Sequence, residues 1–83
     1  MIRLEIMSPE GLLYSCDNAT AVFLPGRLFP FEVLAGHAPI IASLRKGEVR
    51  CVLEDGTSHA VDIESGFVEV KDDVVNVCAE VKG

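Results

Sequence analysis

The middle of the chain reads Leu24-Pro25-Gly26-Arg27-Leu28-Phe29-Pro30-Phe31-Glu32-Val33-Leu34-Ala35-Gly36-His37-Ala38-Pro39-Ile40-Ile41. This stretch holds three of the four prolines and two of the seven glycines in the sequence. Proline withholds the backbone N–H that a strand ladder needs, and glycine permits a positive φ. Residues 24–41 are therefore predicted to form a shaped loop between strands.

The predicted loop is unusually apolar. It carries Leu28, Phe29, Phe31, Val33 and Leu34, whereas loops are normally polar because they face water. An apolar loop either packs into the core or is presented to a partner. Two interpretations stay open at this point: the loop closes one end of a β-sandwich, or its tip docks onto another protein.

Short strands are predicted on both sides of this loop. Ile2, Leu4 and Ile6 alternate with Arg3, Glu5 and Met7, the period of two that is typical of a half-buried strand. Residues 12–16, 19–24 and 40–44 are further candidate strands, and two hairpins follow. Because no apolar stripe of period 3.6 is longer than one turn, no helix is predicted. The expected fold class is all-β, a flattened β-sandwich or barrel of short strands that forms a single domain over residues 1–83.

The register of the first hairpin, residues 48–63, follows from its apolar pattern. A three-residue loop, Glu54-Asp55-Gly56, places Val49 opposite Val61 and Cys51 opposite His59. A two-residue loop would instead mix apolar and charged side chains on each face. We predict the three-residue loop, with Gly56 as its left-handed residue.

The second hairpin is predicted to turn at Asp72-Asp73. This turn places Val70 opposite Val75 and Val68 opposite Val77. Gly66 then faces Ala79, so that one face of the hairpin is wholly small and apolar, and Glu69 opposes Asn76 on the other face.

Composition argues against several classes of function. The net charge is −6, and the only adjacent basic pair, Arg45-Lys46, is too small to form a phosphate-binding footprint, so no nucleic acid is expected. No apolar run reaches the ~20 residues needed to cross a bilayer, so no direct membrane insertion is expected. Three widely spaced cysteines, Cys16, Cys51 and Cys78, fit free thiols in a reducing compartment better than a disulfide framework or a metal site.

The sequence also offers little for catalysis. It contains no Gly-x-Ser-x-Gly elbow and no glycine-rich loop before a helix. His37 and His59 have no carboxylate nearby in the sequence that would pair with them as a general base requires. We therefore expect no catalytic residue, no cofactor and no metal, and the chain is interpreted as a binding module.

Three sequence blocks carry a resemblance to a known family. They are Leu24-Pro25-Gly26 followed by Phe31-Glu32-Val33-Leu34 and Gly36-His37-Ala38-Pro39, then Leu44 with Gly47, then Ser65-Gly66-Phe67-Val68-Glu69-Val70. In this order and spacing the chain closely resembles the N-terminal domain of the epsilon subunit of F-type ATP synthases, whose mitochondrial equivalent is called delta. The resemblance implies a flattened β-sandwich of about ten strands in two sheets.

The resemblance further implies a non-catalytic rotor subunit that links the gamma subunit to the c ring and supports the coupling of ion transport to ATP synthesis. Such a subunit is peripheral, on the cytoplasmic face of the inner (plasma) membrane. By position, the residues implied to face the c ring are Gly26, Arg27, Leu28, Phe29, Pro30 and Phe31. Those implied to lie towards gamma are Ser8, Pro9, His37, Ala38, Pro39, Ile41 and Ala42.

The chain departs from the family pattern in two respects. Phe29, Pro30 and Ala35 stand where the family usually has Gly, an acidic residue and Pro, and Arg27 makes the tip cationic. We therefore expect contact with the ring through Leu28 and Phe29 rather than through an acidic tip. The sequence ends at Lys82-Gly83, before the C-terminal helical hairpin common in the family, so coupling without helix-mediated inhibition is expected. The alternative is a stand-alone β-sandwich adaptor or ligand-binding domain.

Overall fold

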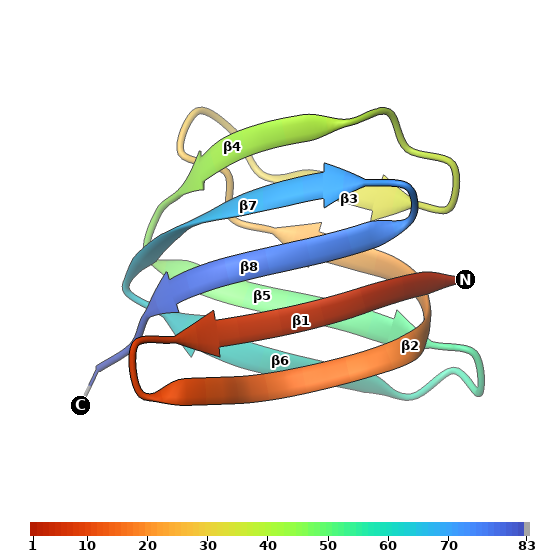
Figure 1. Cartoon of the computed structure of the whole chain (residues 1–83), viewed down its shortest axis with the longest axis horizontal. Helices are drawn as coiled ribbons and strands as arrows, with labels where there is room; N and C mark the ends of the chain where they lie inside the picture. Colours follow the sequence, from red (N-terminus) through yellow and green to blue (C-terminus); the bar gives the residue numbers. More distant parts are fainter. Residues whose placement is uncertain (83) are drawn as a thin grey trace.

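The computed structural model describes residues 1–82, which form eight β-strands and no helix (Figure 1). No helix among these residues has the length and apolar character to cross a membrane. The strands are β1 (Ile2–Ser8), β2 (Gly11–Leu24), β3 (Phe31–Leu34), β4 (Ile40–Leu44), β5 (Gly47–Leu53), β6 (Ser58–Ile63), β7 (Ser65–Lys71) and β8 (Val74–Glu80).

The strands form one continuous hydrogen-bonded sheet in the order β4-β7-β8-β1-β2-β5-β6, and β3 pairs with β2 beside this path. The sheet folds over on itself into two layers (Figure 1). One layer holds β4, β7, β8 and β1, and the other holds β3, β5, β6 and the second half of β2. β1 and β8 run parallel, whereas all the other paired strands are antiparallel.

The predicted all-β, flattened β-sandwich is confirmed, but it has eight strands in one continuous sheet rather than about ten in two. One reason is β2, in which the predicted strands 12–16 and 19–24 are joined without a break. Register shifts opposite β1 and β5 bend this strand, as bulges do, and the bend carries it from one layer to the other.

The loop predicted over residues 24–41 is interrupted by a strand. Residues 31–34 form β3, which pairs with the end of β2. Val33 is buried and Phe31 is half-buried against the core, whereas Glu32 and Leu34 are exposed. This alternation is the strand signal that the surrounding prolines and glycines mask.

Both predicted hairpin registers are confirmed. Val49 pairs with Val61 and Cys51 with His59, and Gly56 has a φ of 88° in the three-residue loop. The second hairpin pairs Val70 with Val75, Val68 with Val77, Gly66 with Ala79 and Glu69 with Asn76. Its turn places Asp72 and Asp73 at φ values of 52° and 61°, which is the two-residue geometry that matches strand twist.

The core lies between the two layers and is aliphatic. No side chain among the buried residues of the described chain is polar or charged. Burial of apolar area at ~25 cal/mol per Å² is therefore the main stabilising term. The largest fully buried side chains are Ile2, Leu4, Ile6, Leu24, Ile63, Val22, Val33, Val49, Val68, Val70, Val75 and Val77.

Candidate partner-binding surface

The tip loop, residues 25–30, connects β2 to β3 and is fastened to the end of β4. The Arg27 N–H donates to the Ser43 carbonyl at 2.9 Å, and the Arg45 N–H donates to the Pro25 carbonyl at 2.9 Å. Gly26 forms an isolated bridge with Leu44. These contacts join the base of the loop to β4 in the pattern of a short antiparallel strand pair.

Gly26 is buried beneath the tip loop. A Cβ at this position would overlap the carbonyl oxygen of Phe29 and crowd the ring of Phe31. The glycine therefore lets the chain fold back closely over its own backbone.

The tip presents two apolar side chains to solvent. Leu28 is 92% exposed and Phe29 is 65% exposed. Phe31, in contrast, packs against the core. Phe31 thus closes the end of the sandwich, as the first interpretation has it, whereas Leu28 and Phe29 project outward. Docking of the tip onto another protein stays a prediction.

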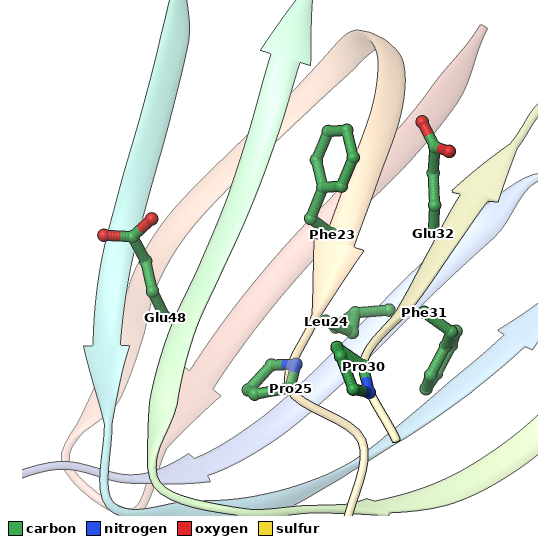
Figure 2. A pocket seen from close by; sticks show the side chains of 7 residues that line it. All are labelled: Phe23, Leu24, Pro25, Pro30, Phe31, Glu32 and Glu48. Carbon is green, nitrogen blue, oxygen red and sulfur yellow. The ribbon is translucent and has the colours of Figure 1, made fainter.

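Surface hollows flank the tip loop on two sides. Figure 2 shows the first, a hollow of about 340 Å³, with Pro25 and Pro30 at the two ends of the loop. Phe23 stands beside it, and the Arg50 guanidinium lies 4.2 Å from the centre of the Phe23 ring. The residues that line it are Phe23, Leu24, Pro25, Pro30, Phe31, Glu32 and Glu48.

The second hollow, of about 380 Å³, lies between the tip loop and β4. It brings together residues predicted for two different partners, because Leu28 and Phe29 of the tip share it with Ile41 and Ala42 of β4. The sequence does not predict this contiguity, because the two sets lie at least 12 positions apart along the chain. The full lining is Gly26, Arg27, Leu28, Phe29, Phe31, Ile40, Ile41, Ala42 and Ser43.

The residues predicted to face gamma fall into two separate groups. Ser8 and Pro9 form the turn between β1 and β2, where the Ser8 hydroxyl donates to the Gly11 carbonyl at 3.3 Å. The second group, residues 37–42, precedes and enters β4. Because β4 runs parallel to β1 with two strands between them, the two groups lie at opposite corners of one face.

His37 lies in a closed local turn rather than in a polar cleft. Its N–H donates to the Leu34 carbonyl at 3.1 Å, and its Nδ1 lies 2.7 Å from the Ala38 carbonyl oxygen. The preceding Gly36 N–H donates to the Asp73 carboxylate at 2.7 Å, which ties this loop to the turn between β7 and β8. In the same segment, Ile41 is 75% exposed.

The one group of reactive side chains gathered in the described residues is at Tyr14. The Cys51 Sγ donates to the Tyr14 hydroxyl at 3.8 Å, and the rings of Tyr14 and His59 have their centres 5.1 Å apart. Burial raises the pKa of the Cys51 thiol, and burial with the nearby thiols raises the pKa of the Tyr14 hydroxyl. Both groups are therefore protonated at neutral pH, a state that suits packing better than nucleophilic attack. Among residues 1–82, no cluster of three His, Cys, Asp or Glu side chains is placed to hold a metal ion.

Further apolar side chains are exposed outside the predicted site, and their exposure was not predicted from the sequence. Phe67 is 52% exposed, Met7 45% and Leu34 52%. The sequence carries a signal for Phe67, because it alternates with the buried Val68 on a predicted strand and must point outward.

Comparison with known proteins identifies the family of this chain. The family model of the ATP synthase delta/epsilon chain β-sandwich domain matches residues 1–81. The chain belongs to this family. The ATP synthase epsilon chain of Campylobacter fetus subsp. fetus is 43% identical over 79 residues, which cover 95% of this chain and 60% of the relative. That of Chlorobium limicola is 40% identical over 68 residues, which cover 82% of this chain and 76% of the relative.

Solved structures share the fold. A chain in the Euglena gracilis mitochondrial ATP synthase assembly of OSCP, F1 and c ring has a TM-score of 0.86 at 24% identity, over 94% of this chain and 49% of that one. A chain in the Tetrahymena thermophila mitochondrial ATP synthase central stalk and c ring has a TM-score of 0.79 at 11% identity, over 95% and 63%. The present chain spans about 60% of the length of the Campylobacter relatives.

Proposed function

We propose that this chain is a non-catalytic central-stalk subunit of an F-type ATP synthase, where it links the gamma subunit to the c ring. In this role it is peripheral to the membrane, on the cytoplasmic face, and supports the coupling of ion transport to ATP synthesis. Family membership favours this role over the alternative of a stand-alone adaptor. The observation that carries the proposal is the apolar tip, which is exposed at Leu28 and Phe29 yet held by backbone bonds to β4.

The architecture suits a part that transmits torque. One continuous sheet, folded over an aliphatic core, resists shear because every strand is bonded to a neighbour. Because hydrogen bonds already hold the base of the tip loop, ordering the loop on binding costs less conformational entropy. Large apolar side chains at the centre of a patch are the usual hot spots, and this nominates Phe29 for contact with the ring.

The test replaces Phe29 by Ser in the full chain, assembled with the gamma subunit and c ring encoded by the same genome. Leu34→Ser is the matched control, because Leu34 is similarly exposed but lies on β3 outside the tip. We expect Phe29→Ser to weaken association with the ring about tenfold, the ~1.4 kcal/mol expected of a moderate hot spot. The thermal midpoint should stay unchanged.

Equal association of the two variants with the ring would count against the tip as the contact. The expectation of coupling without helix-mediated inhibition stays a prediction. It requires that the ATP hydrolysis rate of the complex does not rise markedly when this chain is removed.

A further inference from the structure

Two of the three cysteines approach each other inside one end of the sandwich. Cys16 lies on the first half of β2 next to β1, whereas Cys51 lies on β5 in the other layer (Figure 1). Cys16 pairs with the buried Leu4. Because paired residues point to the same side of a sheet, Cys16 faces the core, where Cys51 is buried. The bend of β2 thus brings together two thiols that are far apart in the sequence.

The Tyr14 hydroxyl lies between the two thiols. The Cys51 Sγ donates to it at 3.8 Å, and the Cys16 thiol interacts with both the Tyr14 hydroxyl and the Cys51 thiol. On the other side, the His59 ring lies over Tyr14, with the ring centres 5.1 Å apart. The two sulfurs are therefore neighbours in one packed cluster, which is the first spatial requirement for a disulfide.

The two thiols differ in their access to solvent. Cys51 is 1% exposed, whereas Cys16 is half-buried at the margin of the core. Burial raises the pKa of the Cys51 thiol, so that this thiol stays protonated and sheltered from reagents in solution. A small oxidant therefore reaches Cys16 first, because oxidation follows exposure. Cys51 lies beside it as a second thiol that its neighbour can reach.

We propose that Cys16 and Cys51 form a redox-sensitive pair, which a peroxide converts into a disulfide between the two layers. In the first step the Cys16 thiolate attacks one oxygen of hydrogen peroxide. The O–O bond breaks, Cys16 becomes a sulfenic acid, and the hydroxide that leaves takes up the thiol proton to form water.

The second step joins the two sulfurs. The Cys51 sulfur attacks the Cys16 sulfur, the S–S bond forms and the S–O bond breaks. The hydroxide leaves as water with the proton of the Cys51 thiol. The pair of thiols is thus oxidised to a disulfide by two electrons, and one hydrogen peroxide is reduced to two molecules of water.

The Tyr14 hydroxyl is placed to assist the second step. Burial is the largest influence on the pKa of the Cys51 thiol and raises it, whereas the hydrogen bond with the Tyr14 hydroxyl lowers it. The hydroxyl accepts from the protonated thiol and can donate to the thiolate. It therefore partly offsets the cost of removing the Cys51 proton within the core.

The disulfide would close a ring over residues 16–51, which contain the tip loop, β3 and β4. All three cysteines are free in this structure, which is the reduced state of the pair. A cross-link that closes a long loop stabilises a protein by restricting its unfolded chain. Oxidation therefore stabilises the sandwich, and a thiol reductant reverses the change. The chemistry requires neither the gamma subunit nor the c ring.

The third cysteine is an internal control. Cys78 pairs with Met7, and both side chains are exposed on the outward face of the sheet. Because Cys16 faces the core on the opposite side of the same sheet, Cys78 has no partner thiol in the folded chain. It is expected to be oxidised singly or to link two chains.

The experiment treats the folded full chain with hydrogen peroxide, blocks the remaining thiols with N-ethylmaleimide and maps the cysteines by mass spectrometry without reduction. The variants are Cys16→Ser and Cys51→Ala, with Cys78→Ser as the matched control. We expect a peptide pair that links Cys16 to Cys51 in the wild type and in Cys78→Ser. In Cys51→Ala, dimedone should instead trap a sulfenic acid at Cys16. Mapping of the wild type needs no variant, so a variant that folds poorly does not decide the result.

A second measurement follows the stability of the wild type. Urea unfolding compares the oxidised chain with the reduced one. We expect a higher urea midpoint after oxidation, and dithiothreitol should return it to the starting value. An unchanged midpoint in a chain that carries the disulfide would overturn the stabilising role.

Two results of the mapping would overturn the redox pair itself. One is a Cys16 sulfinic acid in the wild type together with a Cys51 that stays free. The other is a disulfide between Cys16 and Cys51 that forms only when urea is present during oxidation, because the folded chain then does not hold the two thiols together. Either result leaves the proposed function as it stands.

Discussion

Gly66 illustrates how one residue sets the distance between two strands. A Cβ at this position would overlap the carbonyl oxygen of Cys78 and approach the Ala79 Cα at 3.1 Å. Both contacts are backbone atoms of β8, which cannot turn away as a flexible side chain could. Close pairing of β7 with β8 thus requires glycine here.

We therefore expect Gly66→Ala to lower the free energy of unfolding by about 1–3 kcal/mol, the usual range for overpacking. Urea unfolding followed by circular dichroism measures the change. Ser65→Ala, at the exposed neighbouring position, is the control and should stay within about 0.5 kcal/mol of the wild type. A Gly66→Ala variant as stable as the control would show that β7 and β8 can separate at no cost.

At the residue scale, the sequence predicts which side chains face the core better than it predicts which apolar side chains are exposed. The placement of Gly66 opposite Ala79 follows from pattern alone, because small apolar side chains recur at a period of two. The exposure of Leu28 and Phe29 does not follow from the pattern, since an apolar side chain in a loop is equally compatible with burial. The direction of the tip depends on contacts distant in sequence, the backbone hydrogen bonds that join the base of the tip loop to Ser43 and Arg45.

The loop between β5 and β6 is held by a carboxylate. Asp55 Oδ1 accepts hydrogen bonds from the Thr57 hydroxyl at 2.6 Å and from the Thr57 N–H at 2.9 Å. These bonds favour the charged form and hold the pKa of the Asp55 carboxyl below its usual value. Because the folded-state pKa is depressed, the stabilisation is fully present above the usual pKa and is lost as the pH falls through the depressed one.

We expect Thr57→Ala to return the Asp55 pKa towards its usual value and to lower the urea midpoint at pH 7. At pH 2 the difference in urea midpoint between Thr57→Ala and the wild type should be smaller than at pH 7. Carbon-detected NMR titration of the carboxyl and urea unfolding at the two pH values make the measurement. Ser58→Ala, an exposed hydroxyl next in sequence, should leave the Asp55 titration unchanged. If Thr57→Ala lowers the urea midpoint equally at both pH values, the lost stability does not come from the Asp55 carboxylate.

At the element scale, both hairpins could be predicted from local pattern and β3 could not. The registers of β5-β6 and β7-β8 depend on residues close in sequence, so apolar alternation and turn chemistry suffice. β3 has only four residues, and its partner is the end of β2 across the tip loop. Its formation depends on the closure of that loop, and the local sequence is dominated by proline and glycine.

At the scale of the whole molecule, pairing of the first and last strands decides the architecture. β1 lies between β8 and β2 in the interior of the sheet, and its parallel pairing with β8 joins strands 66 or more residues apart. No periodicity in a single segment predicts such a contact. The strand pattern therefore predicts a β-sandwich or barrel, whereas the pairing of β1 with β8 does not follow from it.

This topology predicts an uneven distribution of local stability. β1 and β8 have bonded neighbours on both sides and contribute fully buried side chains, whereas β6 ends the sheet and is exposed at four of its six residues. Segments with few buried contacts open locally, while interior strands exchange only through global unfolding. We therefore expect native-state hydrogen exchange by NMR to give the free energy of global unfolding for the slowest amides of β1 and β8.

The hydrogen-bonded amides of β6 should instead exchange at a lower free energy that depends little on denaturant. Those of β5, which is paired on both sides, serve as the internal control and should follow β1. Equal free energies and equal denaturant dependence for β6 and β1 would contradict the prediction, because the whole sheet would then open as one unit. Local opening at β6 would leave the pairing of β7, β8 and β1 intact, because none of these strands is bonded to β6.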